Sequence, residues 1–185
     1  MTCVIAAIVG VLCLAVPAGQ MLALNAARPY VENETAADTG PVTIPANIVT
    51  TAGYRADLAA MLRFSPTFRR QCSRIANSAQ LRVLLQRSLL PEVRPDGALT
   101  RIVRTPQGGL EADVQIGMSG DPILLIAHEF EHILEQLDEV DLPAMAERPG
   151  TGVHAISRLG DFETDRAIAA GRRVAEEVSN ARRRQ

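Results

Sequence analysis

The sequence predicts an α+β fold in which a small antiparallel sheet packs against helices. Three observations predict this class. Residues 54–78 have the apolar spacing of two amphipathic helices, residues 81–116 contain strand-like alternation of apolar and polar side chains, and residues 121–181 return to helical spacing. Helices, then strands, then helices again are the order expected of an α+β domain.

The first 27 residues carry no charged side chain. Their apolar stretch has the length of a signal-peptide h-region, and residues 16–18 offer small side chains for cleavage before Gly19. An uncleaved membrane anchor is the main alternative, because the apolar run can cross a bilayer if it extends to Ala27. A third alternative is a true start at Met21 without export. We predict export to the periplasm or extracellular space, or anchoring in the membrane through residues 1–27.

The rest of the chain divides into a linker and one domain. Residues 28–50 mix Pro, Thr, Ala and acidic side chains without periodicity, and we expect a flexible linker there. Residues 51–185 are long enough for one small domain with its own core. A processed chain retains Cys72 alone, so no intramolecular disulfide can form. The net charge of −2 provides no basic surface, and we expect no nucleic-acid partner.

Local signals place the first helices and the strands. The Ser-Pro pair at residues 65–66 separates two helices, because serine caps a helix N-terminus and proline suits the first helical position. Apolar and polar side chains alternate in residues 81–86 and 110–116, and residues 101–105 form a short extended segment. The sequence Pro-Gln-Gly-Gly at residues 106–109 predicts a hairpin connection between the last two strands.

Residues 121–139 predict a helix that carries two of the three histidines of the chain. The Asp-Pro pair at residues 121–122 supplies an N-cap and a first helical residue. At about 100° per residue, His128 and His132 share one face with Glu129 at its flank, and apolar side chains gather on the opposite face. Two imidazoles four residues apart can bind one metal ion, and a carboxylate beside them can take a proton from an attacking water.

The run His128-Glu129-Phe130-Glu131-His132 is the H-E-x-x-H signature, and here the chain resembles the zincin metallopeptidases. The resemblance implies a minimal zincin-like domain, a bound Zn²⁺ and hydrolysis of a peptide or protein substrate. Glu131 departs from the pattern, since zincins mostly carry an uncharged residue at that position. Glu131 can be a hydrogen-bond partner of the His128 imidazole, but we expect a solvated side chain. An ordinary amphipathic helix that happens to carry histidines is the alternative.

Catalytic zinc sites use three protein ligands, so one more is needed. The metzincin pattern places it at Asp138, but in a continuing helix this residue points away from His132. The gluzincin pattern takes a glutamate from a downstream helix, and Glu163 falls on the apolar face of the helix expected at residues 161–181. A buried carboxylate needs a compensating charge, which Zn²⁺ supplies. Pairing of Glu163 with Arg166, or with an arginine elsewhere, is the alternative.

Beyond the ligands, a zincin-like site needs groups that orient the histidines and bind the substrate. Many gluzincins orient a ligand histidine with an aspartate, but Ala167 stands at that position here. His154 lies in a Gly-rich stretch and can either stabilise an oxyanion or be a surface histidine. Zincins bind extended substrates on an edge strand, and residues 110–116 are the candidate for this edge.

Together these features predict a small zinc-dependent metallopeptidase. His128, His132 and Glu163 would hold Zn²⁺, and Glu129 would act as the general base, with His154 as a further catalytic candidate. One alternative is a non-catalytic, metal-stabilised binding or accessory protein of the envelope with the same fold. Another is a metal-free module with an accidental motif, which requires Glu163 to pair with an arginine and the two histidines to point apart.

Overall fold

The computed structural model describes residues 43–157 and 160–185. The predicted leader or anchor at residues 1–27, and the linker up to residue 42, lie outside the described residues. Among the helices that are described, none combines the length and the apolar character that a bilayer crossing requires.

The described part opens with a short strand and two helices. β1 (Ile48–Thr50) is followed by α1 (Ala52–Phe64) and α2 (Pro66–Ala76). Ser65 ends α1 through its backbone N–H, which donates to Met61 O at 2.8 Å, and its Oγ accepts from Phe68 N at 2.9 Å as the N-cap of α2. The Ser-Pro signal therefore predicts this helix boundary correctly. β1 lies in the segment that we assigned to the linker, so the sheet begins before residue 51.

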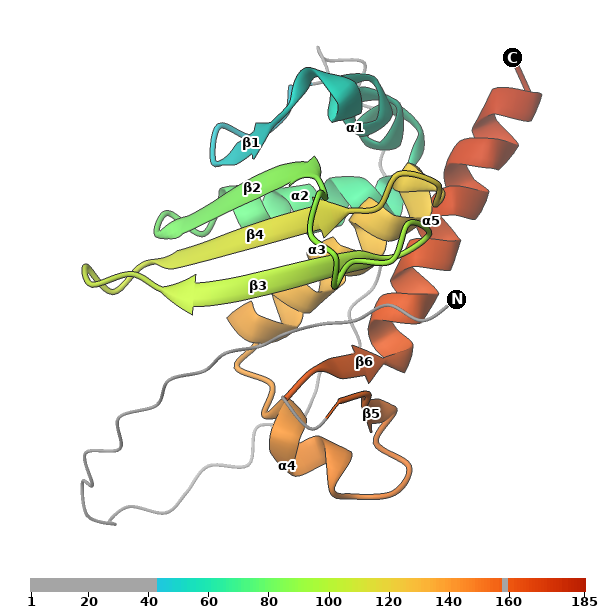
Figure 1. Ribbon diagram of the computed structural model, residues 1–185. Helices are drawn as coiled ribbons and strands as arrows, with labels where there is room; N and C mark the ends of the chain where they lie inside the picture. Colours follow the sequence, from blue (N-terminus) through green and yellow to red (C-terminus); the bar gives the residue numbers. More distant parts are fainter. Residues whose placement is uncertain (1–42, 158–159) are drawn as a thin grey trace, which may run out of the picture. The chain divides into compact units, whose positions relative to one another are not determined.

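β2 (Leu81–Arg87), β3 (Ala98–Arg104) and β4 (Leu110–Ile116) join β1 in a four-stranded sheet of order β1-β2-β4-β3. β1, β2 and β4 run parallel, and only β3 is antiparallel to its neighbour β4 (Figure 1). The sheet is thus mixed, and the prediction of an antiparallel sheet is wrong. The predicted hairpin joins β3 to β4, with Gly108 at a φ of 83°.

The position of β4 in the sheet corrects a second prediction. β4 occupies the residues expected for the third strand, but it lies between β2 and β3 and so has no free edge. Among the described strands, β3 is the last one on this side of the sheet. Parallel pairing of β2 with β4 leaves β3, which follows β2 in the chain, on the outside.

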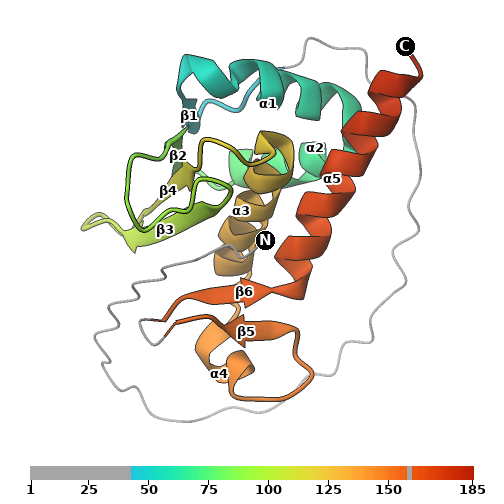
Figure 2. The same ribbon diagram turned by 45° about the vertical axis from the view of Figure 1, so that its right-hand side comes forward.

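α3 (Pro122–Leu137) lies between the sheet and the C-terminal helix α5 (Asp165–Arg183), as Figures 1 and 2 show. Asp121 caps α3 by accepting from Ile123 N at 3.0 Å, as predicted. The core lies against α3, and its largest fully buried side chains include Leu58, Phe68, Ile75, Leu85, Ile126 and Phe130. Burial of each such side chain contributes roughly 1.5–3 kcal/mol. This packing anchors the back of the histidine-bearing helix.

The segment between α3 and α5 contains α4 (Leu142–Ala146), β5 (Val153–Ala155) and β6 (Phe162–Thr164). β5 and β6 pair in an antiparallel two-stranded sheet. α5 begins at Asp165 rather than at residue 161, because Thr164 is its N-cap and accepts from Ala167 N at 3.0 Å. The helix predicted to carry Glu163 therefore starts after this residue, and Glu163 lies in β6 instead.

Candidate metal centre

One turn of α3 places the two imidazoles side by side. His128 and His132 are both buried, and their Nε2 atoms are 3.0 Å apart. A separation of four residues puts both side chains on one face of the helix, as the sequence predicts. The close approach of two ring nitrogens is the arrangement that a shared metal ion requires.

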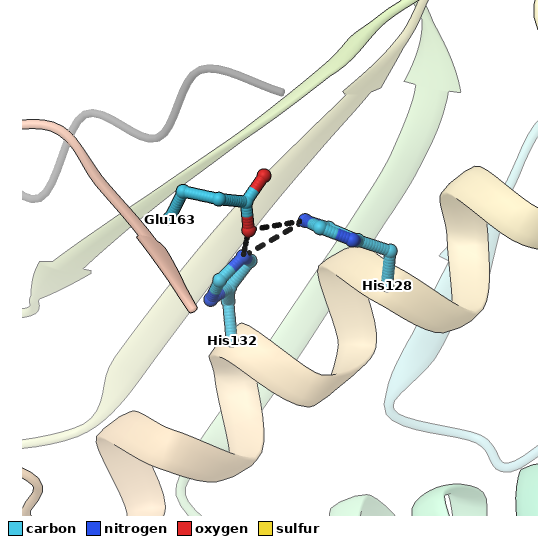
Figure 3. A group of neighbouring side chains, drawn as sticks. All are labelled: His128, His132 and Glu163. Atoms are coloured by element: carbon cyan, nitrogen blue, oxygen red, sulfur yellow. Dashed lines mark hydrogen bonds and ion pairs between the residues drawn. The ribbon is translucent and has the colours of Figure 1, made fainter. Parts of the chain in front are cut away.

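Glu163 completes a group of three side chains. From β6 its Oε1 atom lies 3.2 Å from His128 Nε2 and 3.6 Å from His132 Nε2 (Figure 3). One ligand atom from each residue can be chosen so that all three lie within 4.8 Å of one another. The wrong secondary structure was predicted for Glu163, but its convergence with the histidines was predicted correctly.

These distances fit a tetrahedral metal ion. Zinc binds nitrogen and oxygen at about 2.0–2.2 Å, so two ligand atoms of a tetrahedral site are roughly 3.3–3.5 Å apart. The three separations in the group, 3.0, 3.2 and 3.6 Å, are close to this value. Two imidazoles and one carboxylate are also a known donor set of catalytic zinc sites. The group could therefore hold a metal ion.

The charges of the group are strongly coupled. Burial disfavours the imidazolium of His132, but hydrogen bonds to Glu135 and Glu163 and the charge of Glu129 outweigh it and raise the pKa of His132 to about 9. Burial likewise disfavours the carboxylate of Glu163, but the hydrogen bonds from His128 and His132 prevail and lower the pKa of Glu163 to about 2. Without a metal, a positive His132 thus faces a negative Glu163.

Glu135 orients one of the imidazoles. His132 Nδ1 donates to Glu135 Oε2 at 2.7 Å, which leaves Nε2 facing Glu163 and His128. Such a carboxylate fixes the tautomer and the ring direction of a metal-binding histidine. Ala167 lacks the carboxylate that orients a histidine in many gluzincins, and Glu135 supplies one to His132 from the same helix as the ligand.

Glu129 has a defined partner on the edge strand. Its carboxylate is completely buried, and its Oε2 accepts from the hydroxyl of Thr100 at 2.7 Å. Thr100 belongs to β3, so this hydrogen bond joins α3 to β3. The carboxylate lies close enough to His132 for its charge to raise the pKa of that imidazole.

Two further acidic residues of the motif region face away from the imidazole pair. Glu131 is buried, and it accepts from Gln71 Nε2 at 2.7 Å and from Arg166 Nε at 2.6 Å. The prediction of a solvated Glu131 is therefore wrong, because α2 and α5 each supply a partner for its carboxylate. Asp138 ends α3 and pairs with Arg74 and Arg166, in agreement with its rejection as a ligand.

His154 lies on β5, directly across the strand pair from Glu163. Its side chain is 57% exposed, and its Nε2 lies 3.1 Å from Asp165 Oδ1. Opposite residues of an antiparallel pair project from the same face of the sheet. His154 is thus a surface histidine beside the ligand strand, and no contact joins it to His128 or His132 among the contacts of the described residues.

Three residues that hold the site together were missed in the sequence. Thr164 and Glu135 had local signals, since a threonine followed by an aspartate is typical of a helix N-terminus and Glu135 lies one turn beyond His132 on the same face. Thr100 had none, because its contact with Glu129 depends on how the sheet packs against α3.

The accidental-motif alternative fails on this geometry. It requires Glu163 paired with an arginine, but Glu163 faces the two imidazoles, and Arg166 binds Glu131 and Asp138. Comparisons with protein-family models, with curated proteins and with solved structures show no match to the chain. The metal-site assignment therefore rests on these side chains alone.

Proposed function

We propose that this protein is a small zinc-dependent metallopeptidase. The observation that carries the proposal is the convergence of His128, His132 and Glu163 to metal-binding distances, with Glu129 adjacent in the same helix. Two imidazoles and a carboxylate leave one zinc coordination position open, which distinguishes a catalytic site from a structural one. A closed structural site has no need of a buried carboxylate such as Glu129 beside it.

Each residue has a role in this reaction. Zinc, when bound, supplies a Lewis acid that polarises the scissile carbonyl. Glu129 takes a proton from the attacking water and returns it to the leaving amine, and the Thr100 hydroxyl holds its carboxylate in place. His154, on the strand next to Glu163, is the candidate donor to the oxyanion of the tetrahedral intermediate.

The edge strand supports a peptide as the substrate. Among the described strands β3 is the last in the sheet order, and its residue Thr100 contacts Glu129, so this strand lies next to the proposed catalytic base. The free N–H and C=O groups of an edge can pair with an extended peptide with little regard to its sequence. We therefore assign peptide binding to β3, in place of β4.

The uncharged segment at residues 1–27 supports a location outside the cytoplasm. A protein with such a leader is exported to the periplasm or extracellular space, or remains anchored to the membrane by it. The expected partner is then a peptide or protein substrate of that compartment.

Replacement of the proposed base tests catalysis separately from metal binding. The full-length chain is loaded with zinc and assayed on a mixed peptide library, with mass-spectrometric detection, as wild type, Glu129→Gln and Glu147→Gln. Glu129→Gln retains zinc and loses about 10²- to 10⁴-fold in rate, since that is the typical contribution of a general base. Glu147, which is exposed after α4, is the matched control and retains activity. Equal activity of all three proteins would exclude Glu129 as the base.

A second candidate function is that of a metal-binding protein without catalytic activity. The complete burial of Glu129 and its hydrogen bond to Thr100 also suit a carboxylate that only stabilises the fold. In this case the protein is a metal-stabilised binding or accessory protein of the envelope. Wild-type protein that binds zinc but cleaves no peptide in the library, together with a lower melting temperature for Glu129→Gln, would favour this candidate.

A further inference from the structure

The proposed metal ligands come from two elements that are far apart in the chain. His128 and His132 belong to α3, and Glu163 belongs to β6. A metal site binds more tightly when its ligands are held in place before the metal arrives. A contact that fixes β6 against the histidine face of α3 therefore holds the three ligands together.

Thr164 makes this connection with its side chain and its backbone. Its hydroxyl donates to Glu135 Oε1 at 2.6 Å and accepts from Ala167 N at 3.0 Å as the N-cap of α5. Its backbone N–H donates to Glu163 Oε1 at 2.8 Å, which is the oxygen that faces the imidazoles. One residue thus contacts the ligand of β6, the start of α5 and a carboxylate of α3.

Glu135 continues the chain of contacts to the metal ligand His132. Its two oxygens are used separately, since Oε1 accepts from Thr164 and Oε2 accepts from His132 Nδ1. Thr164 and Glu135 are each 2% exposed. Water therefore cannot reach either side chain to replace a lost hydrogen bond, and the loss is costly. A continuous series of hydrogen bonds therefore links the proposed ligand His132, through Glu135 and Thr164, to the proposed ligand Glu163.

We infer that the Thr164 hydroxyl is a positioning group that sets the metal affinity of the site, by holding Glu135 against His132 and β6 against α3. This inference rests on the proposed metal site. The N–H of Thr164 remains when the side chain changes, so substitution tests the hydroxyl alone. Loss of a partner that orients a metal ligand typically weakens metal binding about 10- to 100-fold.

The chain offers a matched control in Ser65. This residue is also a buried helix N-cap, since its Oγ accepts from Phe68 N and donates to Glu177. Ser65 therefore has the same arrangement of backbone donor, hydroxyl and carboxylate as Thr164. Glu177 has no contact with the metal group among the contacts of the described residues, so loss of the Ser65 hydroxyl reports on capping alone.

Zinc affinity of the full-length chain is measured by competition with a chromophoric chelator, for wild type, Thr164→Val, Thr164→Ser and Ser65→Ala. Thr164→Val weakens zinc binding roughly 10- to 100-fold, and Thr164→Ser restores affinity to near the wild-type value. Ser65→Ala lowers the melting temperature but leaves zinc affinity unchanged. Equal zinc affinity of Thr164→Val and wild type overturns the inference, as does an equal loss of affinity in Ser65→Ala. If Thr164→Val does not fold, Glu135→Gln takes its place with the same expected loss.

A second readout needs no metal and separates this inference from the proposed function. In the metal-free wild type, the Nδ1 proton of His132 gives a slowly exchanging downfield NMR resonance because Glu135 holds it. This resonance persists in Thr164→Ser and Ser65→Ala and broadens in Thr164→Val. If wild-type protein binds no zinc, the proposed function and the effect of Thr164 on metal affinity both fail, and the His132 resonance still decides whether Thr164 positions Glu135. An unchanged resonance in Thr164→Val contradicts it.

Discussion

At the residue scale, the candidate site concentrates negative charge next to two imidazoles. Glu129, Glu135 and Glu163 are all buried and all interact with His132. Buried carboxylates are costly unless a positive charge compensates them. A protonated His132 supplies one positive charge, whereas a divalent metal ion supplies two. The density of carboxylates therefore favours a metal ion over a proton as the natural occupant of the group.

The coupled charges make the stability of the metal-free protein dependent on pH. The pKa of His132 rises from 6.5 to about 9 on folding, so the folded state holds more protons than the unfolded state between these values. The contribution of His132 to the free energy of unfolding is fully present below pH 6.5 and is lost as the pH rises through 9. Glu163 has the opposite sign, because its pKa falls from 4.5 to about 2, and its contribution is lost as the pH falls through this range.

Denaturant unfolding in the presence of a chelator checks this behaviour. The free energy of unfolding of the metal-free protein decreases from pH 6.5 to pH 9. The increase in stability on adding zinc grows over the same range, since a ligand histidine must be neutral to bind metal. A metal-free protein whose stability is constant from pH 6.5 to pH 9 would contradict the pairing of His132 with Glu135 and Glu163.

At the element scale, the approach of α5 to α3 depends on a glycine. A Cβ atom at Gly171 would lie 2.8 Å from the backbone oxygen of Leu124 and 3.1 Å from Cβ of His128. Backbone atoms cannot move aside as a side-chain end can, so Gly171→Ala forces the helices apart next to a metal ligand. We expect a net loss of about 1–3 kcal/mol of stability and weaker zinc binding.

Gly53 is the control for this substitution. It lies in α1, and a Cβ atom there meets nothing within 4 Å. Gly53→Ala should stabilise the protein by about 0.5–1 kcal/mol through helix propensity, without a change in zinc affinity. Thermal unfolding and zinc titration of both variants check the pair, and tighter zinc binding by Gly171→Ala would contradict the packing described.

The buried Glu131 ties three helices together on the side of α3 away from the metal ligands. It binds Gln71 of α2 and Arg166 of α5, and Arg166 also binds Asp138. Arg166→Ala leaves Glu131 without its cation, and we expect a loss of about 1–3 kcal/mol, limited by the partial exposure of the arginine. Urea unfolding measures this loss. Zinc affinity should remain within about threefold of wild type, and a much larger change would show that Glu131 acts on the site.

Elements with strong local signals were predicted well from the sequence, and elements set by tertiary contacts were not. The Asp-Pro start of α3 and the alternation of β4 depend only on residues that are close together in the sequence, and both predictions agree with the structure. Glu163 was placed on a helix because Ala167 and Val174 continue its apolar spacing. The N-cap at Thr164 interrupts that helix, and the pairing with β5 holds Glu163 in a strand instead.

At the scale of the whole domain, the sheet order could not be read from the sequence. Strand alternation identifies which face of a strand is buried, but not which strand is its neighbour. β2 pairs in parallel with β4, although β3 lies between them in the sequence. The short β1 pairs with β2 on the opposite side from β4. The convergence of Glu163 with the histidines agrees with the prediction although the helical spacing used for it was wrong, because a buried glutamate requires a positive partner in either secondary structure.

Elemental analysis tests the metal centre most directly. Full-length wild type is reconstituted with zinc, passed over a desalting column and compared with His128→Ala, His132→Ala, Glu163→Ala and the surface control His154→Ala. We predict about one zinc ion per chain in wild type and His154→Ala, and a weakened or lost ion in the other three. Zinc-free wild-type protein, or equal zinc content in all five proteins, would contradict a metal site formed by His128, His132 and Glu163.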